Sequence, residues 1–367
     1  MFNDSFGALK KYDYSFFGLM FVIFVFGVFN LYSATNSDPS MSELYKTQLL
    51  YFVISCTVGG ALSFANPKTI FRYSFIIYGI NIFLLILVLL LGKIGMGAQR
   101  WLVVGPIRLQ PSELMKVSVV LALARWFSRA NPERGLVLKD LIVPGLLAFV
   151  PAILVIIQPD LGTGLLILLI FALIVFYRKL HWKSIGIIAL LGVIGGGLMY
   201  KYGLKEYQRK RIHTFINPYA DAKGSGYNAI QSEIAIGSGR LFGKGYMKSS
   251  QGALAFLPEN HTDFVFSIFN EEHGLIGSIF LITIYLMLFY RFMWLSTSAM
   301  HFYESILAVG LMSIFFWHTL INMCMVTGLM PVVGLPLPLM SYGGSSLLTF
   351  AIVTGLATSI SNSRNLF

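Results

Sequence analysis

The chain has 367 residues, of which 56% are hydrophobic and only 12% are charged. Soluble domains carry about twice that share of charge, and apolar runs of about 20 residues recur along the chain, so we expect one polytopic membrane protein rather than two soluble domains. The net charge of +11 suits a protein beside anionic lipids or lipid-linked anionic substrates. No fold-level nucleic-acid motif accompanies the charge, so it does not indicate a nucleic-acid partner.

The apolar runs predict an all-α polytopic membrane protein with ten transmembrane helices. We treat residues 1–367 as a single membrane domain that carries one large extracytoplasmic loop at residues 202–263. The two cysteines, Cys56 and Cys324, lie inside apolar runs and are interpreted as buried hydrophobic residues. The predicted spans are about 14–34, 46–65, 71–92, 112–128, 139–157, 161–177, 184–201, 264–290, 303–327 and 343–361.

Basic residues in the short loops predict the orientation in the membrane. Few lie on one side, chiefly Lys46, Lys93, Arg100 and Arg108. The other side carries Lys10, Lys11, Lys68, Arg72, Arg125, Arg129, Arg134, Lys139, Arg178, Lys179, Lys183, Arg291 and Arg364. We therefore expect both termini in the cytoplasm and the loop before residue 263 outside. Because ATP is absent there and the chain has no P-loop, a reaction outside must use an already activated substrate, such as one carried by lipid.

Asp263 lies near the end of the only long polar stretch, residues 206–277, at the point where a new apolar helix begins. One interpretation is that it only caps that helix. The other is functional, because a carboxylate at a membrane boundary is costly and marks a site by default. The six histidines show no metal-binding spacing, and His261 is the only one beside this acid. We interpret His261 as an orienting neighbour rather than a metal ligand.

A second acid, Glu113, lies three residues before Lys116, so the two side chains can pair on one helix. The pair could only fix helix packing, or Lys116 could line an anion site with Glu113 positioning it. Gln110-Pro111-Ser112-Glu113 is echoed by Gln158-Pro159-Asp160. Both stretches suit helix starts, with a proline and an acid in the first turn.

Two further segments could bind anions. The basic run Arg209-Lys210-Arg211, together with Arg100, is either a solvated surface patch or a phosphate-binding set, since arginine binds phosphate bidentately. Residues 328–346 are apolar, but three prolines and four glycines exclude a regular helix there. Such broken backbone persists at membrane depth only when it is buried or lines a wet cavity. Its serines, Ser341, Ser345 and Ser346, could cap the last helix, or the backbone amides there could hold an anion.

Taken together, these motifs resemble the SEDS family (shape, elongation, division and sporulation), and within it the elongation branch. They run in order along nearly the whole chain. His273 and Ala255 depart from the usual pattern, which affects only local packing or surface charge. The matching pieces are Gln99-Arg100-Trp101, Gln110-Pro111-Ser112-Glu113 with Lys116, Gln158-Pro159-Asp160-Leu161-Gly162-Thr163, Tyr207-Gln208-Arg209, Gly226-Tyr227-Asn228, Ala235-Ile236-Gly237-Ser238-Gly239, the stretch 256–264, Gly334-Leu335-Pro336-Leu337-Pro338 and Ser341-Tyr342-Gly343-Gly344-Ser345-Ser346.

The resemblance implies a ten-helix enzyme of the bacterial cytoplasmic membrane. It would polymerise lipid II into peptidoglycan glycan on the outer leaflet, alongside a class B penicillin-binding protein that crosslinks the product. Carried onto this chain, the family's essential aspartate is Asp263, and its paired acid and lysine are Glu113 and Lys116.

The expected reaction is inverting glycosyl transfer with Asp263 as general base. Cations would stabilise the diphosphate leaving group, and a divalent cation, Mg²⁺ or Mn²⁺, could share that role. A lipid flippase and a scaffold that recruits a synthase are the competing interpretations. The residues expected to bind substrate are Arg100, Glu113, Lys116, Asp160, Arg209, Arg211, His261, Thr262, Ser341 and Ser345.

Overall fold

The computed structural model describes residues 12–36, 41–95, 98–104, 107–129, 135–222, 224, 226–253, 257 and 259–366. A helix lies at each of the ten ranges predicted to span a membrane. These helices are α2 (Ser15–Thr35), α3 (Leu44–Ser63), α4 (Pro67–Leu91), α5 (Pro111–Phe127), α6 (Ile142–Ile157), α7 (Leu161–Tyr177), α8 (Trp182–Leu198), α12 (Val265–Ser298), α13 (Phe302–Val326) and α14 (Gly344–Leu366).

Shorter elements join them. The segment before α12 contains a π-helical turn (Met199–Gly203), α9 (Glu206–Ile216), a 3₁₀ turn (Pro218–Asp221), α10 (Tyr227–Gly239) and α11 (Ser250–Ala253), and another 3₁₀ turn (Leu138–Leu141) precedes α6. Between α4 and α5 lie β1 (Lys93–Gly95), β2 (Ala98–Val104) and β3 (Ile107–Leu109), which form an antiparallel sheet in the order β1-β2-β3. The expectation of an all-α chain was therefore wrong for this connection. The strands are too short to give a periodic signal, although Gly97 and the Gly105-Pro106 pair are typical of turns between strands.

Within the described ranges, seven helical segments are long and apolar enough to cross a membrane. They are α2, α4, residues 138–157, residues 182–203, α12, α13 and α14, and α7 is a shorter apolar helix. The two remaining helices are more polar: α5 has 17 residues and carries Glu113 and Lys116, and α3 carries Lys46 and Gln48. The chain is thus a polytopic membrane protein, and the count of ten spans stays a prediction.

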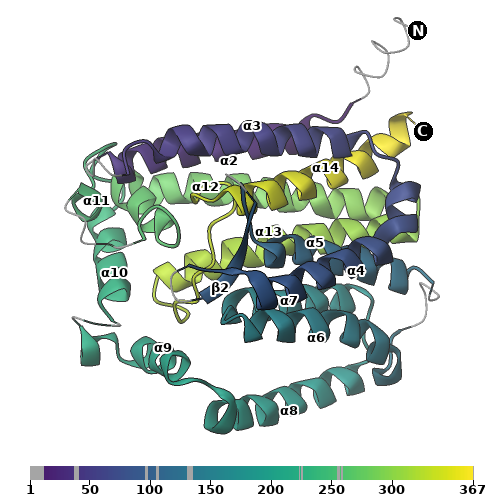
Figure 1. The fold of residues 1–367 in the computed structure, drawn as a ribbon. Helices are drawn as coiled ribbons and strands as arrows, with labels where there is room; N and C mark the ends of the chain where they lie inside the picture. Colours follow the sequence, from purple (N-terminus) through teal and green to yellow (C-terminus); the bar gives the residue numbers. More distant parts are fainter. Residues whose placement is uncertain are drawn as a thin grey trace, which may run out of the picture.

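The core surrounds α5 and α13, which lie in the middle of the bundle (Figure 1). On one side are α2, α3 and α14, with α12 beside α13, and on the other are α4, α6 and α7 (Figure 1). By contrast, α8 runs apart from the other helices, and Ser184 is the one buried residue among those described in it (Figure 1). A helix that is apolar all round and exposed suits contact with lipid.

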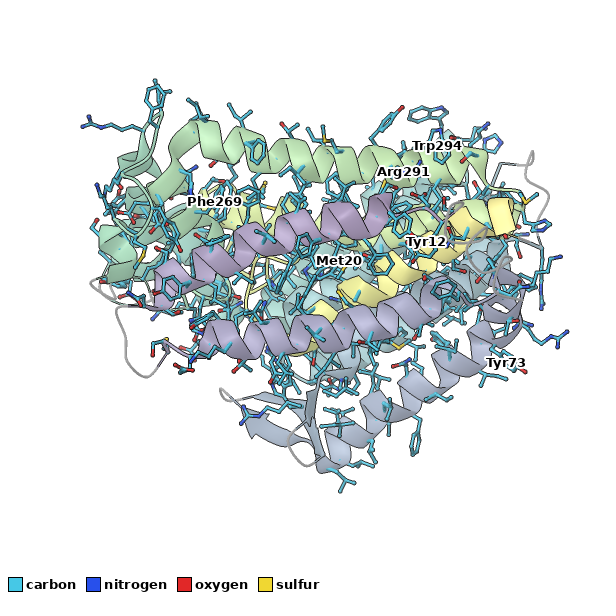
Figure 2. All side chains as sticks on the ribbon, turned by 90° about the horizontal axis from the view of Figure 1, so that it is seen from above. Tyr12, Met20, Tyr73, Phe269, Arg291 and Trp294 are labelled. Carbon is cyan, nitrogen blue, oxygen red and sulfur yellow. The ribbon has the colours of Figure 1, made fainter. Side chains whose placement is uncertain are left out.

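The start of α2 and the end of α14 lie at the same end of the bundle, opposite α10 and α11 (Figure 1). Figure 2 shows Tyr12 near Arg291 and Trp294 at one end of α12, and Phe269 at the other. Asp13 anchors this end, because its carboxylate accepts hydrogen bonds from Arg291 and from the Ser361 hydroxyl (2.6 Å). The first and last helices of the described chain therefore meet at the end of the molecule opposite α10 and α11. Which end faces the cytoplasm stays a prediction.

A backbone break at Gly274 divides α12 into a short first part and a long second part. Residues 240–245 fill the break. The N–H groups of Leu275 and Ile276 donate to the carbonyls of Arg240 (2.9 Å) and Leu241 (3.1 Å). In return, Lys244 and Gly245 donate their N–H groups to the carbonyls of residues 271 and 272 at 2.9 and 3.0 Å. This exchange satisfies backbone groups that the break leaves unpaired, and it fixes the start of α12 against the polar segment.

Candidate active site

Asp263 belongs to a tight turn that precedes α12. The Glu259 carbonyl accepts hydrogen bonds from the N–H groups of Thr262 (3.1 Å), Asp263 (3.2 Å) and Phe264 (3.3 Å). Phe264 occupies the N-cap position of α12, where no side-chain cap bond forms. The interpretation of Asp263 as a helix cap is therefore wrong, and its carboxylate is left for another role.

The neighbours of Asp263 come from the connection between α13 and α14. Asn322 on α13 donates its side-chain amide to the Asp263 carbonyl oxygen (2.8 Å) and to the Leu335 carbonyl oxygen (2.7 Å). At Gly334, which has φ +77°, an added methyl group would lie 3.2 Å from Asp263 Oδ2. Glycine is favoured there both by its backbone conformation and by the closeness of the carboxylate.

The surroundings of Asp263 raise its pKa. Burial is the largest cause, and Glu259 and Asp160 add to it, whereas Arg211 and Arg100 oppose it, so that the pKa is raised to about 6. A carboxyl group of that pKa is largely ionised at neutral pH yet is a stronger base than an ordinary aspartate. This is the property that general-base catalysis needs.

Four basic residues were predicted as a phosphate-binding set: Arg100, Arg209, Lys210 and Arg211. Two of them, Arg100 and Arg211, lower the pKa of Asp263. Arg100, on β2, donates to the Gln158 carbonyl oxygen (3.3 Å) and to that of Pro159, and Arg211, on α9, donates to the Val332 carbonyl oxygen (3.1 Å). Lys210 instead pairs with Asp221 (2.9 Å), and Arg209 donates to the Lys201 carbonyl oxygen (2.9 Å). Arg100 and Arg211 both lower the pKa of Asp263, so the structure associates these two cations with the acid. Arg209 belongs instead to the turn before α9.

Asp160 caps α7, as its place at a helix start predicts, and it also bonds to the residue before α5. Its Oδ1 accepts the N–H of Thr163 (3.2 Å) and caps α7, while Oδ2 accepts from the Gln110 amide (3.3 Å). The Gln110 N–H in turn donates to Ser345 Oγ (3.2 Å), and this hydroxyl donates to the Arg108 carbonyl oxygen (3.2 Å). These bonds join the starts of α5, α7 and α14 on the side of the molecule that carries Asp263.

The turn at residues 259–264 is bonded to the connection before α14. Ser341 Oγ donates to the Thr262 carbonyl oxygen (2.5 Å), and the Tyr342 N–H donates to the His261 carbonyl oxygen (2.9 Å). The Thr262 hydroxyl donates to Glu259 Oε2 (2.9 Å). Burial lowers the pKa of the His261 imidazole, whose buried Nδ1 has no hydrogen-bond partner among the described residues. His261 is thus a neutral neighbour of Asp263 at neutral pH, with one polar atom unused.

Glu113 and Lys116 form the predicted pair, with Nζ 2.8 Å from Glu113 Oε1. Lys116 is fully buried, and its Nζ also lies 2.6 Å from His318 Nε2. His318 Nδ1 is 3.1 Å from the Pro336 carbonyl oxygen. Because a carbonyl can only accept, His318 carries its proton on Nδ1, and Nε2 accepts from the lysine. A lysine with no exposed surface favours positioning over direct contact with substrate.

Sequence reasoning missed His318 and Asn322. They are four residues apart on α13 and therefore share a face, and this spacing is the signal that could have found them. Among the described residues, no group of three or more His, Cys, Asp or Glu side chains could hold a metal ion. A divalent cation stays a prediction.

Comparison with known proteins identifies the family of the chain. The cell cycle protein family of FtsW, RodA and SpoVE matches residues 13–366. The chain is 37% identical over 348 residues to the peptidoglycan glycosyltransferase MrdB of Escherichia coli K12, covering 95% of this chain and 93% of that protein.

Two solved structures share the fold. One is described as "Structural coordination of polymerization and crosslinking by a peptidoglycan synthase complex"; it is 30% identical with a TM-score of 0.82, and the match covers 97% of this chain and 99% of that one. The crystal structure of the Thermus thermophilus rod shape determining protein RodA is 29% identical with a TM-score of 0.70, covering 97% and 98% of the two chains. The chain therefore belongs to the FtsW, RodA and SpoVE family of cell cycle proteins, as its motifs predict.

Proposed function

We propose that the protein is the lipid II polymerase of cell elongation, and that it makes β-1,4-linked glycan strands on the outer face of the bacterial cytoplasmic membrane. One observation carries the proposal: Asp263 is a partly buried acid with its pKa raised to about 6, and it lies in the field of Arg100 and Arg211. The 37% identity to a named peptidoglycan glycosyltransferase supports this class of reaction.

In the proposed reaction, Asp263 takes the proton from the 4-hydroxyl of the acceptor sugar. That oxygen forms a bond to the anomeric carbon of the donor, and the bond from this carbon to the diphosphate oxygen breaks. The anomeric configuration changes from α to β, and undecaprenyl diphosphate leaves with the bonding electrons. One acid is enough, because a diphosphate leaves without protonation, whereas glycoside hydrolases need two carboxyl groups.

Positive charge must balance the charge that develops on the diphosphate. Arg100 and Arg211 are the proposed sources, since both act on Asp263 and guanidinium groups bind phosphate bidentately. A divalent cation, Mg²⁺ or Mn²⁺, would add to the same stabilisation. The remaining candidates, Glu113, Lys116, Ser341 and Ser345, would hold backbone in place around the site through the bonds described above.

The proposed setting follows from the same arguments. We place the segment at residues 202–263 outside the cell, with ten membrane spans and both termini in the cytoplasm. A class B penicillin-binding protein would crosslink the product. The structural relative described as part of a peptidoglycan synthase complex supports such a partner.

The test uses the purified protein in liposomes that carry lipid II. We expect glycan strands on a gel with the wild-type protein, and none with Asp263→Ala. Movement of lipid II across the bilayer without polymer would instead identify a flippase. Polymer formation by Asp263→Ala at the wild-type rate would reject the assigned base. If polymer forms only after a synthase partner is added, and Asp263→Ala then supports as much polymer as the wild type, the protein is a scaffold.

A further inference from the structure

The connection between α13 and α14 depends on side chains from other helices. We call residues 334–341 the proline segment. Pro336 and Pro338 have no N–H group, so the segment cannot form a helix and its carbonyls need outside donors. Three of them have one: Leu335 accepts from Asn322 (2.7 Å), Pro336 from His318 (3.1 Å) and Pro338 from the Tyr285 hydroxyl (2.6 Å).

One of these donors, Asn322, also holds the turn that carries Asp263. His318 and Asn322 are one helical turn apart on α13, and Asn322 bonds the Asp263 carbonyl as well as the proline segment. Gly334, at the start of the segment, lies against the Asp263 carboxylate. The face of α13 therefore sets the position of the acid relative to the backbone beside it.

His318 extends this arrangement to the buried ion pair. Its Nε2 accepts from Lys116, which is itself paired with Glu113, and all three side chains are buried. A buried lysine cannot move without breaking hydrogen bonds to charged groups, which is expensive. The lysine and the Pro336 carbonyl are thus linked through the two nitrogens of one ring.

We propose that His318 is a positioning residue for the polymerase reaction: it couples the Glu113–Lys116 pair to the proline segment, and the proline segment fixes the geometry of Asp263. This inference rests on the proposed role of Asp263 as the base. Because His318 acts on the base and not on the lipid substrate, its loss should lower kcat and leave KM for lipid II almost unchanged. A shift of about 1 Å in a reacting group can cost on the order of 100-fold in rate.

Two conservative variants separate the two nitrogens. An asparagine amide lies near the position of Nδ1, so His318→Asn keeps a donor for Pro336 and loses the acceptor for Lys116. His318→Gln does the reverse, while His318→Leu removes both. We expect His318→Leu to lose roughly 10- to 100-fold in kcat, and the two amide variants to fall between it and the wild type. His301→Asn, an exposed histidine at the opposite end of the same helix, is the matched control and should not change kcat.

A double-mutant cycle tests the coupling itself. If His318 transmits the position of Lys116, the double variant Lys116→Met/His318→Leu should be no slower than the slower single variant. Independent roles would instead multiply the two losses. Melting temperatures of the detergent-solubilised variants show which of them are folded, and the amide variants supply the comparison if His318→Leu does not fold.

The inference would be overturned by kcat within about twofold of wild type for His318→Leu, by an effect on KM alone, or by multiplied losses in the cycle. Each of these results leaves the proposed function intact as long as Asp263→Asn is inactive. Conversely, an active Asp263→Asn rejects the base, whatever the His318 variants do. The two failures are therefore distinguishable.

Discussion

At the scale of single residues, the site combines one unusual acid with the backbone that surrounds it. Asp263 could be found from the sequence because it is an acid at the boundary of an apolar run. The spacing of His318 and Asn322 could have placed them on one helix face, but their roles and that of Gly334 depend on contacts with residues distant in the chain, which the sequence does not show. Lys116 was found, but its full burial and its bond to His318, which the sequence does not show, favour positioning over substrate contact.

The raised pKa of Asp263 predicts how the rate depends on pH. A general base works only when deprotonated, so polymerisation should rise with pH, with a midpoint near the pKa of about 6, and then level off. Arg211 lowers this pKa and Glu259 raises it. We therefore expect Arg211→Gln to move the midpoint to higher pH and Glu259→Gln to move it to lower pH.

Initial rates of lipid II polymerisation between pH 5 and pH 8 check this prediction. Midpoints that move in the same direction in both variants, or a wild-type rate that does not change across the range, would contradict it.

At the scale of elements, apolar periodicity located the long helices well, because a membrane requires long apolar runs. It could not locate β1 to β3, nor show that α8 runs apart from the bundle, because neither depends on the hydropathy of the segment itself. Apolar periodicity also did not predict the break in α12, for a similar reason. It is set by backbone hydrogen bonds to residues 240–245, which lie 30 residues or so earlier in the chain.

Close packing of α3 on α14 makes a specific prediction about two adjacent glycines. A methyl group at Gly59 would collide with the Ala351 carbonyl oxygen, whereas one at Gly60 would meet no atom within 4 Å. Gly59→Ala should therefore destabilise the protein, by about 1–3 kcal/mol as is typical of overpacking. Gly60→Ala is the matched control, since it places the same methyl group on the same helix.

Thermal unfolding of the two variants in one detergent gives the comparison. We expect a lower melting temperature for Gly59→Ala, and a melting temperature for Gly60→Ala at or slightly above that of the wild type, since alanine favours a helix more than glycine does. Equal melting temperatures for the two variants would show that α3 and α14 are not packed this closely.

At the scale of the whole molecule, the start of α2 and the end of α14 lie at the end of the bundle opposite α10 and α11. The basic residues of the short loops predict that the termini and the candidate site lie on opposite sides of the membrane. Charge along the chain could not show that both ends of the chain are joined through Asp13, which bonds Arg291 on α12 and Ser361 on α14. The arrangement is what a polymerase needs if substrate is used on one side of the membrane only.

Membrane orientation can be tested with single cysteines. In a variant without Cys56 and Cys324, Lys210→Cys lies on exposed α9 and Lys68→Cys lies at the exposed start of α4. A maleimide that does not cross membranes should label Lys210→Cys in intact cells, and Lys68→Cys only after permeabilisation. The reverse pattern would place the candidate site in the cytoplasm, where the proposed reaction could not occur.

The central claim is tested most directly by the polymerisation rate of Asp263→Asn with purified lipid II. The amide keeps the shape of the side chain but cannot accept the proton from the acceptor hydroxyl, so we predict a rate at least ~100-fold below wild type with an unchanged helical circular dichroism spectrum. A folded Asp263→Asn protein that polymerises within about threefold of the wild-type rate would contradict the account, because general-base catalysis contributes on the order of 100-fold or more.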